Sequence, residues 1–446
     1  MSRTEPARGM RDFLPIDVRR REYVRGVIAQ VYEKYGFEPL ETPAVENIET
    51  LLGKYGEEGN QLIFKILKRG EHEATGKADL ALRYDLTVPL ARVVAEHGAR
   101  LPRLFKRYQI QPVWRADRPA RGRFREFYQC DIDAIGSISP VVESELCMAV
   151  GDAILQLGFS DFKIRLNHRE VLRTLLVNAE IDSGQHGEVL ATLDKLERIG
   201  RDGVAEELSN RGVSRDSLSQ LIGWLVADSG SHDLDWLQNQ MSDIDEVGHA
   251  AFDNLRKILE LTNQSITGSH LRFDPSLARG LSYYTGAIME INVPDLTGSI
   301  GGGGRYDDLL GLFSNKKVPA CGFSLGLERM LVVMSEREMF PSDLINSTAD
   351  VMVCVFDEGN ISHAFVLASL LRESGLRVMV YPDMDKIGKQ IKYASAVGIS
   401  CVAILGTDEI SRSEVTVKEL ATGRQTVFSQ ENVSVGVKEI LGEYRG

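Results

Sequence analysis

The segment from residue 101 to residue 135 constrains the fold more than any other part of the sequence. Its side chains alternate with period two, and the alternation is broken once, near residues 116–122. Successive side chains of a β-strand point to opposite faces, so this period indicates two strands joined by a turn. The sequence therefore predicts a long antiparallel hairpin.

The returning strand of this hairpin has two chemically different faces. The polar parity is made up of Arg123, Arg125, Phe127, Gln129, Asp131 and Asp133. The mostly apolar parity is made up of Phe124, Glu126, Tyr128, Cys130, Ile132 and Ala134. The apolar face is suited to pack on a core, whereas polar groups in a row on a central strand need a partner. The alternative is a solvent-exposed face of an antiparallel sheet.

The hairpin also concentrates positive charge in an acidic chain. The net charge is −12, which argues against nucleic acid as a partner, but Arg100–Arg125 holds nine basic residues and one acid. This local excess of eight positive charges could hold polyphosphate, an RNA backbone or both. A solvated basic face is the alternative.

The length and the pattern of the rest of the chain indicate several domains. A chain of 446 residues is too long for one hydrophobic core, so we expect two or three. Helical spacing marks 17–35, with Gly36 as its end, and 141–157; several amphipathic helices follow between about 170 and 265. From about 349, strands and helices alternate as in a small α/β domain with a largely parallel sheet.

The composition is that of an ordinary globular protein of a reducing compartment. The first residues carry no apolar run, and no stretch is long and apolar enough to span a bilayer. The five cysteines are scattered and form no CxxC pair, so we expect buried thiols rather than disulfides or zinc ligands. These features predict a cytoplasmic protein without a membrane partner.

Three further segments carry polar or glycine-rich patterns. Asp85 and Thr87 precede a helix expected to start near Pro89, either as site residues or as helix-entry residues. LARGLSYYTGAIMEI (277–291) places an arginine and two tyrosines on a turn into a strand, and GGGG (301–304) is followed by no P-loop lysine. CGFSLGLERM (321–330) predicts a strand and then a helix, whose first turn holds Arg329, a poor charge there unless it meets an anion.

Together these segments resemble the class II aminoacyl-tRNA synthetases and, within them, the histidyl-tRNA synthetases. YGFEPLETPAVE resembles motif 1, KRYQIQPVWRADRPARGRFREFYQCDIDAIG motif 2 and GFSLGLER motif 3. LARGLSYYTGAI and GGGGRYDDLLG resemble the two histidine-specific sequences. The resemblance covers essentially the whole chain.

The resemblance implies a fold and a domain order. The catalytic α+β domain, an antiparallel sheet flanked by helices, would span 1–168 and 269–340 and be interrupted by a helical insertion at 169–268. An α/β anticodon-binding domain would follow at 349–446. Pro43 of motif 1 would lie at a homodimer interface, and the insertion is expected to contact tRNA.

The resemblance also implies the substrates and the roles of the site residues. The substrates would be L-histidine, ATP with Mg²⁺ and the histidine tRNA, with no tightly bound cofactor and no metal held by the protein. Arg115 and Arg279 would grip the α-phosphate and the histidine carboxylate. ATP would be held by Arg115, Arg123, Phe127 and Arg329. The histidine pocket would consist of Asp85, Leu86, Thr87, Arg115, Gln129, Asp133, Arg279, Tyr283 and Tyr284.

Two positions depart from the family pattern. Ser282 stands where an aspartate is usual, which bears on pocket geometry. Near Ala120 many bacterial relatives carry a glutamine that helps to read the tRNA, and this chain lacks it. Three alternatives remain. The chain could be a non-catalytic regulatory subunit of histidine biosynthesis, a synthetase for proline, threonine or glycine, or a plain RNA-binding module. The retained arginines disfavour the regulatory subunit, and the two histidine-specific sequences disfavour another synthetase. The pocket of acidic residues and tyrosines disfavours a plain RNA-binding module.

Overall fold

A computed structural model describes residues 4–70, 75–225, 233–279, 283–314, 317–341, 344 and 349–445. The chain divides into two compact units, Met1–Met339 and Phe340–Gly446. Within the described ranges, no helix combines the length and the apolar character that crossing a membrane requires.

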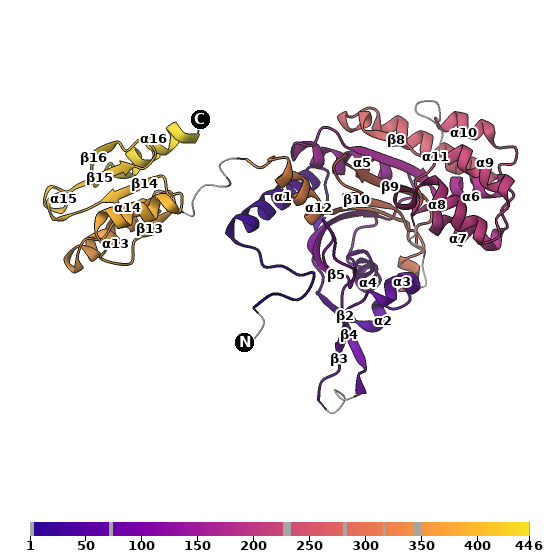
Figure 1. The fold of residues 1–446 in the computed structure, drawn as a ribbon, viewed down its shortest axis with the longest axis horizontal. Coiled ribbons are helices and arrows are strands. Elements are labelled where there is room, and N and C mark those ends of the chain that lie inside the picture. The colour runs from indigo at the N-terminus through magenta and orange to yellow at the C-terminus, as the bar shows by residue number, and fades with distance from the viewer. Residues whose placement is uncertain are drawn as a thin grey trace. The chain divides into compact units, whose positions relative to one another are not determined.

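The first unit is built on an eight-stranded sheet with the order β1-β5-β6-β11-β10-β9-β7-β8 (Figure 1). All neighbours in it are antiparallel except the pairs β1–β5 and β7–β8. In chain order the strands are β1 (Glu38–Pro39), β5 (Phe105–Trp114), β6 (Glu126–Ile135), β7 (Lys163–His168), β8 (Leu271–Phe273), β9 (Ala287–Asn292), β10 (Gly301–Arg305) and β11 (Ala320–Gly326).

Three helices cover the apolar face of the central strands: α1 (Pro15–Lys34), α5 (Val141–Gln156) and α12 (Leu327–Glu336). Cys130 and Ile132 of β6 pair with Leu325 and Phe323 of β11, and all four side chains are buried. The expected helices at 17–35 and 141–157 are therefore confirmed, and Gly36 adopts φ +75 just past α1.

The segment between β1 and β5 forms a smaller layer. Its three-stranded sheet has the order β2-β4-β3, with β2 (Val45–Asn47), β3 (Lys65–Leu67) and β4 (Ala78–Leu82). The helices are α2 (Ile48–Leu51), α3 (Gly56–Gln61) and α4 (Thr87–His97). The start predicted for the last of these, near Pro89, was two residues late. A core cluster around Tyr84, Leu90 and Leu309 packs α4 against the Phe105–Ile135 end of the hairpin.

Helices fill the chain between β7 and β8, and Figure 1 shows them gathered at one side of this unit. They are α6 (Arg169–Asn178), α7 (His186–Leu193), α8 (Leu196–Asn210), α9 (Arg215–Leu225), α10 (Leu234–Gln240) and α11 (Glu246–Thr262). Asp233 and Asp245 cap the last two by accepting backbone N–H bonds. The several amphipathic helices expected between about 170 and 265 are present, and Gly200 kinks α8 at φ +72.

The second unit contains a five-stranded sheet with the order β13-β12-β14-β15-β16. The expected alternation of strands and helices is confirmed by β12 (Val351–Val353), α13 (Ile361–Glu373), β13 (Val378–Val380), α14 (Ile387–Ala396) and β14 (Cys401–Ile404). Two antiparallel strands and two helices, which the pattern did not reveal, complete it: α15 (Thr407–Arg412), β15 (Glu414–Glu419), β16 (Gln425–Ser429) and α16 (Val433–Arg445). All five cysteines of the chain are buried free thiols, as expected.

Candidate active site

The polar face of the hairpin is buried. Gln129, Asp131 and Asp133 are at most 8% exposed, which contradicts the alternative of a solvated sheet face. Across the sheet they pair with Gln111, Gln109 and Arg107 of β5 on one side and with Gly326, Ser324 and Gly322 of β11 on the other. Because facing residues of neighbouring strands point to the same side, these groups form one polar surface in the middle of the sheet.

One of the two aspartates has an ion pair and a hydrogen bond, although its Oδ2 has no hydrogen-bond partner among the described residues. Asp133 forms an ion pair with the fully buried Arg107 (2.7 Å between Oδ2 and Nη2) and accepts a hydrogen bond from the Tyr306 hydroxyl. Arg107 also donates to Gln109 and to the carbonyl oxygen of Leu86. This cluster fixes the floor of the polar surface.

The other aspartate keeps an open oxygen. Asp131 is 2% exposed and lies 4.0 Å from the nearest guanidinium nitrogen of Arg107, and its Oδ1 has no hydrogen-bond partner among the described residues. The same is true of Oε1 of Gln129, whose Nε2 donates to Ser324. Burial raises the pKa of Asp131 to about 7; Arg107 lowers it in part, and the neighbouring Asp133 adds to the rise. Two unpartnered buried oxygens side by side suit a ligand that donates hydrogen bonds.

The glycine run is itself a central strand, β10, and its lack of side chains makes room for two predicted site residues. A Cβ on Gly302 would lie 1.8 Å from Nη1 of Arg279, and one on Gly304 would lie 2.8 Å from the ring of Tyr284. Gly322 likewise leaves space for the carboxylate of Asp133. The glycines therefore allow side chains to lie flat on the sheet.

Arg279 and the tyrosines form one side of the site. The Arg279 guanidinium is held by Glu290 of β9 (3.3 Å), which also pairs with Arg165 of β7. Tyr283 and Tyr284 contact each other with ring centroids 4.8 Å apart. A small hollow is lined by Arg169, Leu172, Leu190, Arg279, Tyr284 and Ile288, so α6 and α7 reach this side of the site.

Asp85, Leu86 and Thr87 lie at the entry of α4. Asp85 is 4% exposed, and its Oδ1 accepts hydrogen bonds from the Tyr55 hydroxyl and from the backbone N–H of Val88. The hydrogen bond from Val88 gives Asp85 the helix-entry role that was one of its two expected interpretations. Burial raises the pKa of Asp85, while Arg115 opposes the rise. Leu86 is buried and Thr87 partly buried.

Arg115 and Phe127 lie at the loop end of the hairpin. Arg115 donates to the Tyr84 carbonyl oxygen, and its guanidinium lies over the rings of Tyr84 and Phe127 at 4.3 and 5.2 Å. These cation–π contacts orient the guanidinium and leave most of its N–H groups for a ligand.

The loop beyond them brings two arginines together. Arg123 is exposed and lies outside β6, which begins at Glu126, so its predicted place on the strand was wrong. It is bridged to Ala120 through the backbone. Arg329 donates to the Thr297 carbonyl oxygen, and its Nε is buried without a partner among the described residues. Burial lowers the pKa of Arg329, and the adjacent Arg123 lowers it further, which makes this place favourable for an anion.

The N-terminal segment supports this loop, a role that no motif or period in the sequence indicated. The backbone N–H of Arg125 donates to the Gly9 carbonyl oxygen, and Arg11 lies 3.3 Å from the centroid of the Phe124 ring. From α1, Arg21 pairs with Glu328 of α12 (2.8 Å) in a buried contact, and Glu328 also accepts from the backbone of β6. The loop and the start of α12 are thus held in fixed positions.

The structure brings most of the predicted site residues to one face of the eight-stranded sheet. The basic residues of Arg100–Arg125, in contrast, have different partners in different places. Within that segment Arg107 is buried in the floor, Lys106 pairs with Glu145 and Arg121 pairs with Glu336, so the charges do not form one patch. Ser282 lies outside the described residues, and Ala120 is exposed.

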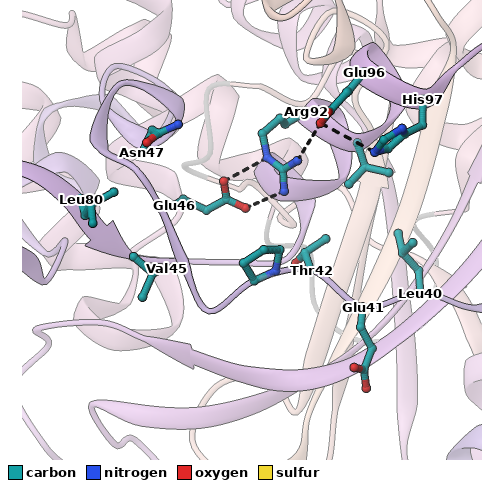
Figure 2. Close-up of a pocket in the computed structure, with 12 residues that line it drawn as sticks. Leu40, Glu41, Thr42, Val45, Glu46, Asn47, Leu80, Arg92, Glu96 and His97 are labelled. Carbon is teal, nitrogen blue, oxygen red and sulfur yellow. Dashed lines mark hydrogen bonds and ion pairs between the residues drawn. The ribbon is translucent and has the colours of Figure 1, made fainter.

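A second hollow lies around Pro43 (Figure 2). It is open, its volume is about 630 Å³, and Thr42, Pro43, Glu46, Arg92 and His97 are among its lining residues. The Arg92 guanidinium pairs with Glu46 and with Glu96.

An antiparallel sheet with a buried polar surface and four arginines, joined to a separate α/β unit, defines a class II aminoacyl-tRNA synthetase. The family model described as histidyl-tRNA synthetase matches residues 9–330, and that of an anticodon-binding domain matches residues 350–440. The chain belongs to the histidyl-tRNA synthetase family, as the sequence predicted.

Relatives that are similar over nearly the full length support this assignment. The chain is 39% identical to a histidine–tRNA ligase of Cytophaga hutchinsonii, covering 95% of this chain and 97% of the relative. It is 40% identical to that of Gloeobacter violaceus, covering 94% of each. A crystal structure of histidyl-tRNA synthetase from Nostoc sp. PCC 7120 is similar with a TM-score of 0.82 and 29% identity over 98% of this chain and 100% of that chain.

A structure titled as an ATP phosphoribosyltransferase regulatory subunit/histidyl-tRNA synthetase, from Bacillus halodurans, is also similar. It has a TM-score of 0.75 at 23% identity and covers 91% of this chain and 99% of that chain. At this identity the similarity concerns the fold alone. The regulatory alternative is therefore less well supported than the enzyme.

Proposed function

We propose that the chain activates L-histidine with ATP and transfers it to the 3′ end of the histidine tRNA. In the first step the histidine carboxylate attacks the α-phosphorus of ATP, which forms histidyl-adenylate and releases pyrophosphate. In the second step a terminal ribose hydroxyl of the tRNA attacks the acyl carbon, and AMP leaves.

The observation that carries the proposal is the convergence of a buried carboxylate pocket and several arginines on one sheet face. The first step brings an anion to an anion, so negative charge builds up in the transition state. Fixed guanidinium groups stabilise that charge without reorganising. Positioning two bound reactants can lower the barrier by roughly 7–11 kcal/mol, so no nucleophilic side chain is required.

The roles of the arginines follow their positions. Arg279 would hold the histidine carboxylate, since Glu290 and Gly302 fix its guanidinium on the sheet. Arg115 would bind the carboxylate and the α-phosphate together, beside Phe127, which would stack on adenine. Arg123 and Arg329 would hold the outer phosphates, because they are adjacent cations with an unpartnered N–H.

Histidine would lie between Arg279 and the acidic residues of the hairpin. Asp85, Thr87 and Gln129 would surround its ammonium group next to Leu86, and Asp133, Tyr283 and Tyr284 would surround its ring. Buried groups that require hydrogen bonds can reject apolar analogues by roughly 10⁴–10⁵.

Magnesium is expected as its complex with ATP. Glu290, the acidic group on β9, is already paired with two arginines. The N–H groups of the arginines therefore suit phosphate oxygens, and Glu290 is less suited to hold a metal. When bound, the cation would add positive charge at the phosphates.

The remaining proposals concern the domains and partners. The family resemblance supports a homodimer through motif 1 and a contact of the helical insertion with tRNA. It also supports the domain boundaries 1–168, 169–268, 269–340 and 349–446. The open hollow beside Pro43 is compatible with a partner surface. The cytoplasmic location stays a prediction.

Amino-acid-dependent exchange of pyrophosphate into ATP, measured without tRNA for each amino acid, tests the activation step. Exchange with histidine alone is expected. Exchange with another amino acid would overturn the specificity. No exchange, from a folded protein that still binds histidine, would favour the regulatory alternative.

A further inference from the structure

Glu290 of β9 lies between two arginines. Its Oε1 is 3.3 Å from Nη1 of Arg165 on β7, and its Oε2 is 3.3 Å from Nη1 of Arg279. A carboxylate bound to a single guanidinium is usually closer, at about 2.7–2.9 Å. The side chains of Arg165 and Glu290 are only 15% and 16% exposed, so water screens these charges in part. The carboxylate is therefore shared between the two cations, one oxygen to each.

The register of the sheet places these groups in one row. Glu290 pairs with Arg165 of β7 on one side and with Gly302 of β10 on the other. The Arg279 guanidinium lies over Gly302, where a Cβ would be 1.8 Å from its Nη1. Arg279 is thus the member of the row nearest to the polar surface of β6, and Arg165 is the member farthest from it.

Arg165 is also held from its other side. Its Nε is 2.7 Å from Oδ2 of Asp274, the residue after β8, and its Nη2 donates to the hydroxyl of Ser276 at 3.2 Å. Asp274 in turn accepts hydrogen bonds from the backbone N–H and the hydroxyl of Ser276. These contacts keep Arg165 within reach of one oxygen of Glu290.

The sharing of this carboxylate bears on what Arg279 can bind. Its hydrogen bonds to Glu290 and to the carbonyl oxygen of Met289 both come from Nη1. A guanidinium has five N–H donors, and a carboxylate with two available oxygens can take a pair of them. Without Arg165, Glu290 could turn both oxygens to Arg279 and would then compete with a substrate carboxylate.

We infer that Arg165 is a positioning residue that keeps Arg279 available for the carboxylate of the substrate by sharing Glu290 with it. Arg165 acts through Glu290 and does not itself hold the substrate. This inference rests on the proposed function, in which Arg279 holds the histidine carboxylate, and adds a residue to it.

A double-mutant cycle between Arg165 and Glu290 in the full-length protein tests this role, with histidine-dependent pyrophosphate exchange as the assay. Arg165→Met should lower kcat/KM for histidine about 10- to 100-fold, the usual worth of a hydrogen bond to a charged group. In a Glu290→Gln background the same substitution should lower it by less than about threefold, because a neutral amide competes poorly for Arg279.

Two controls separate this role from a structural effect. Asp274→Ala removes the other ion pair of Arg165 and should leave kcat/KM within about threefold of the wild type, because the contact with Glu290 remains. L-Histidinol, in which a hydroxymethyl group replaces the carboxylate, should inhibit Arg165→Met and the wild type with constants that agree within about twofold. A distorted pocket would weaken histidinol as well as histidine.

Four results would overturn the inference: an unchanged kcat/KM in Arg165→Met, an equal loss in the Glu290→Gln background, an equal loss in Asp274→Ala, or a parallel loss of histidinol binding. If Arg165→Met does not fold, Arg165→Lys takes its place in the same cycle, because one ammonium group cannot contact Asp274 and Glu290 together as a guanidinium does. If the wild type itself shows no exchange with histidine, it is the proposed function that fails.

Discussion

Replacing Asp131 by asparagine should make the free protein more stable at alkaline pH. The pKa of Asp131 is raised from 3.8 to about 7, mainly by burial. A carboxyl group whose pKa is higher in the folded state stabilises the fold below its unfolded pKa, and this stability is lost as the pH rises through the folded pKa. Above about pH 7 the wild type therefore carries a buried charge that asparagine lacks.

The size of the effect follows from the shift. Three pKa units at 1.36 kcal/mol each give an upper limit of about 4 kcal/mol in the free energy of unfolding. Because Asp131 interacts with Asp133, we expect roughly half of this. The difference between variant and wild type should be small near pH 4, grow between pH 4 and pH 7, and remain constant above.

Urea unfolding at a series of pH values, without substrates, measures this difference. Asp161→Asn is a suitable control, because a hydrogen bond from Arg337 lowers the pKa of Asp161 and removing that charge should give no gain at alkaline pH. A gain for Asp131→Asn that does not vary with pH, or a loss of stability at pH 8, would refute the reasoning.

Three other substitutions test the arrangement of the site. Gly302→Ala should displace the guanidinium that lies on this glycine and lower kcat for pyrophosphate exchange by about 100-fold, whereas Gly223→Ala, in open space, should have no effect. Arg329→Ala should raise the KM for ATP by 10-fold or more with little change for histidine; equal changes for both substrates would argue against a phosphate contact. Glu328→Gln should destabilise the protein by about 3 kcal/mol in thermal or urea unfolding, because Arg21 is buried against it; an unchanged midpoint would contradict this.

The periodic parts of the fold could be predicted from the sequence. The hairpin, α1, α5 and the alternating strands and helices of the second unit were recognisable because one face of each element is buried, which imposes a period on the side chains. β10 could not be recognised, since a strand of glycines has no side-chain pattern; what defines it is the approach of Arg279 and Tyr284.

The site could be predicted in part. The parity of β6 placed Phe127, Gln129 and Asp133 on one face, and the structure confirms this arrangement. Parity alone could not show that Arg107, on another strand, forms an ion pair with Asp133 and that Tyr306 donates a hydrogen bond to it, because this depends on cross-strand register and on side-chain reach.

Attachment of labelled histidine to the histidine tRNA tests most directly whether the chain charges this tRNA. The assay uses the purified full-length protein with ATP and Mg²⁺, and a tRNA for another amino acid as the control. We predict that labelled histidine becomes attached to the histidine tRNA and not to the control tRNA. Attachment of another amino acid, or no attachment by a folded protein that binds both histidine and the tRNA, would contradict the account.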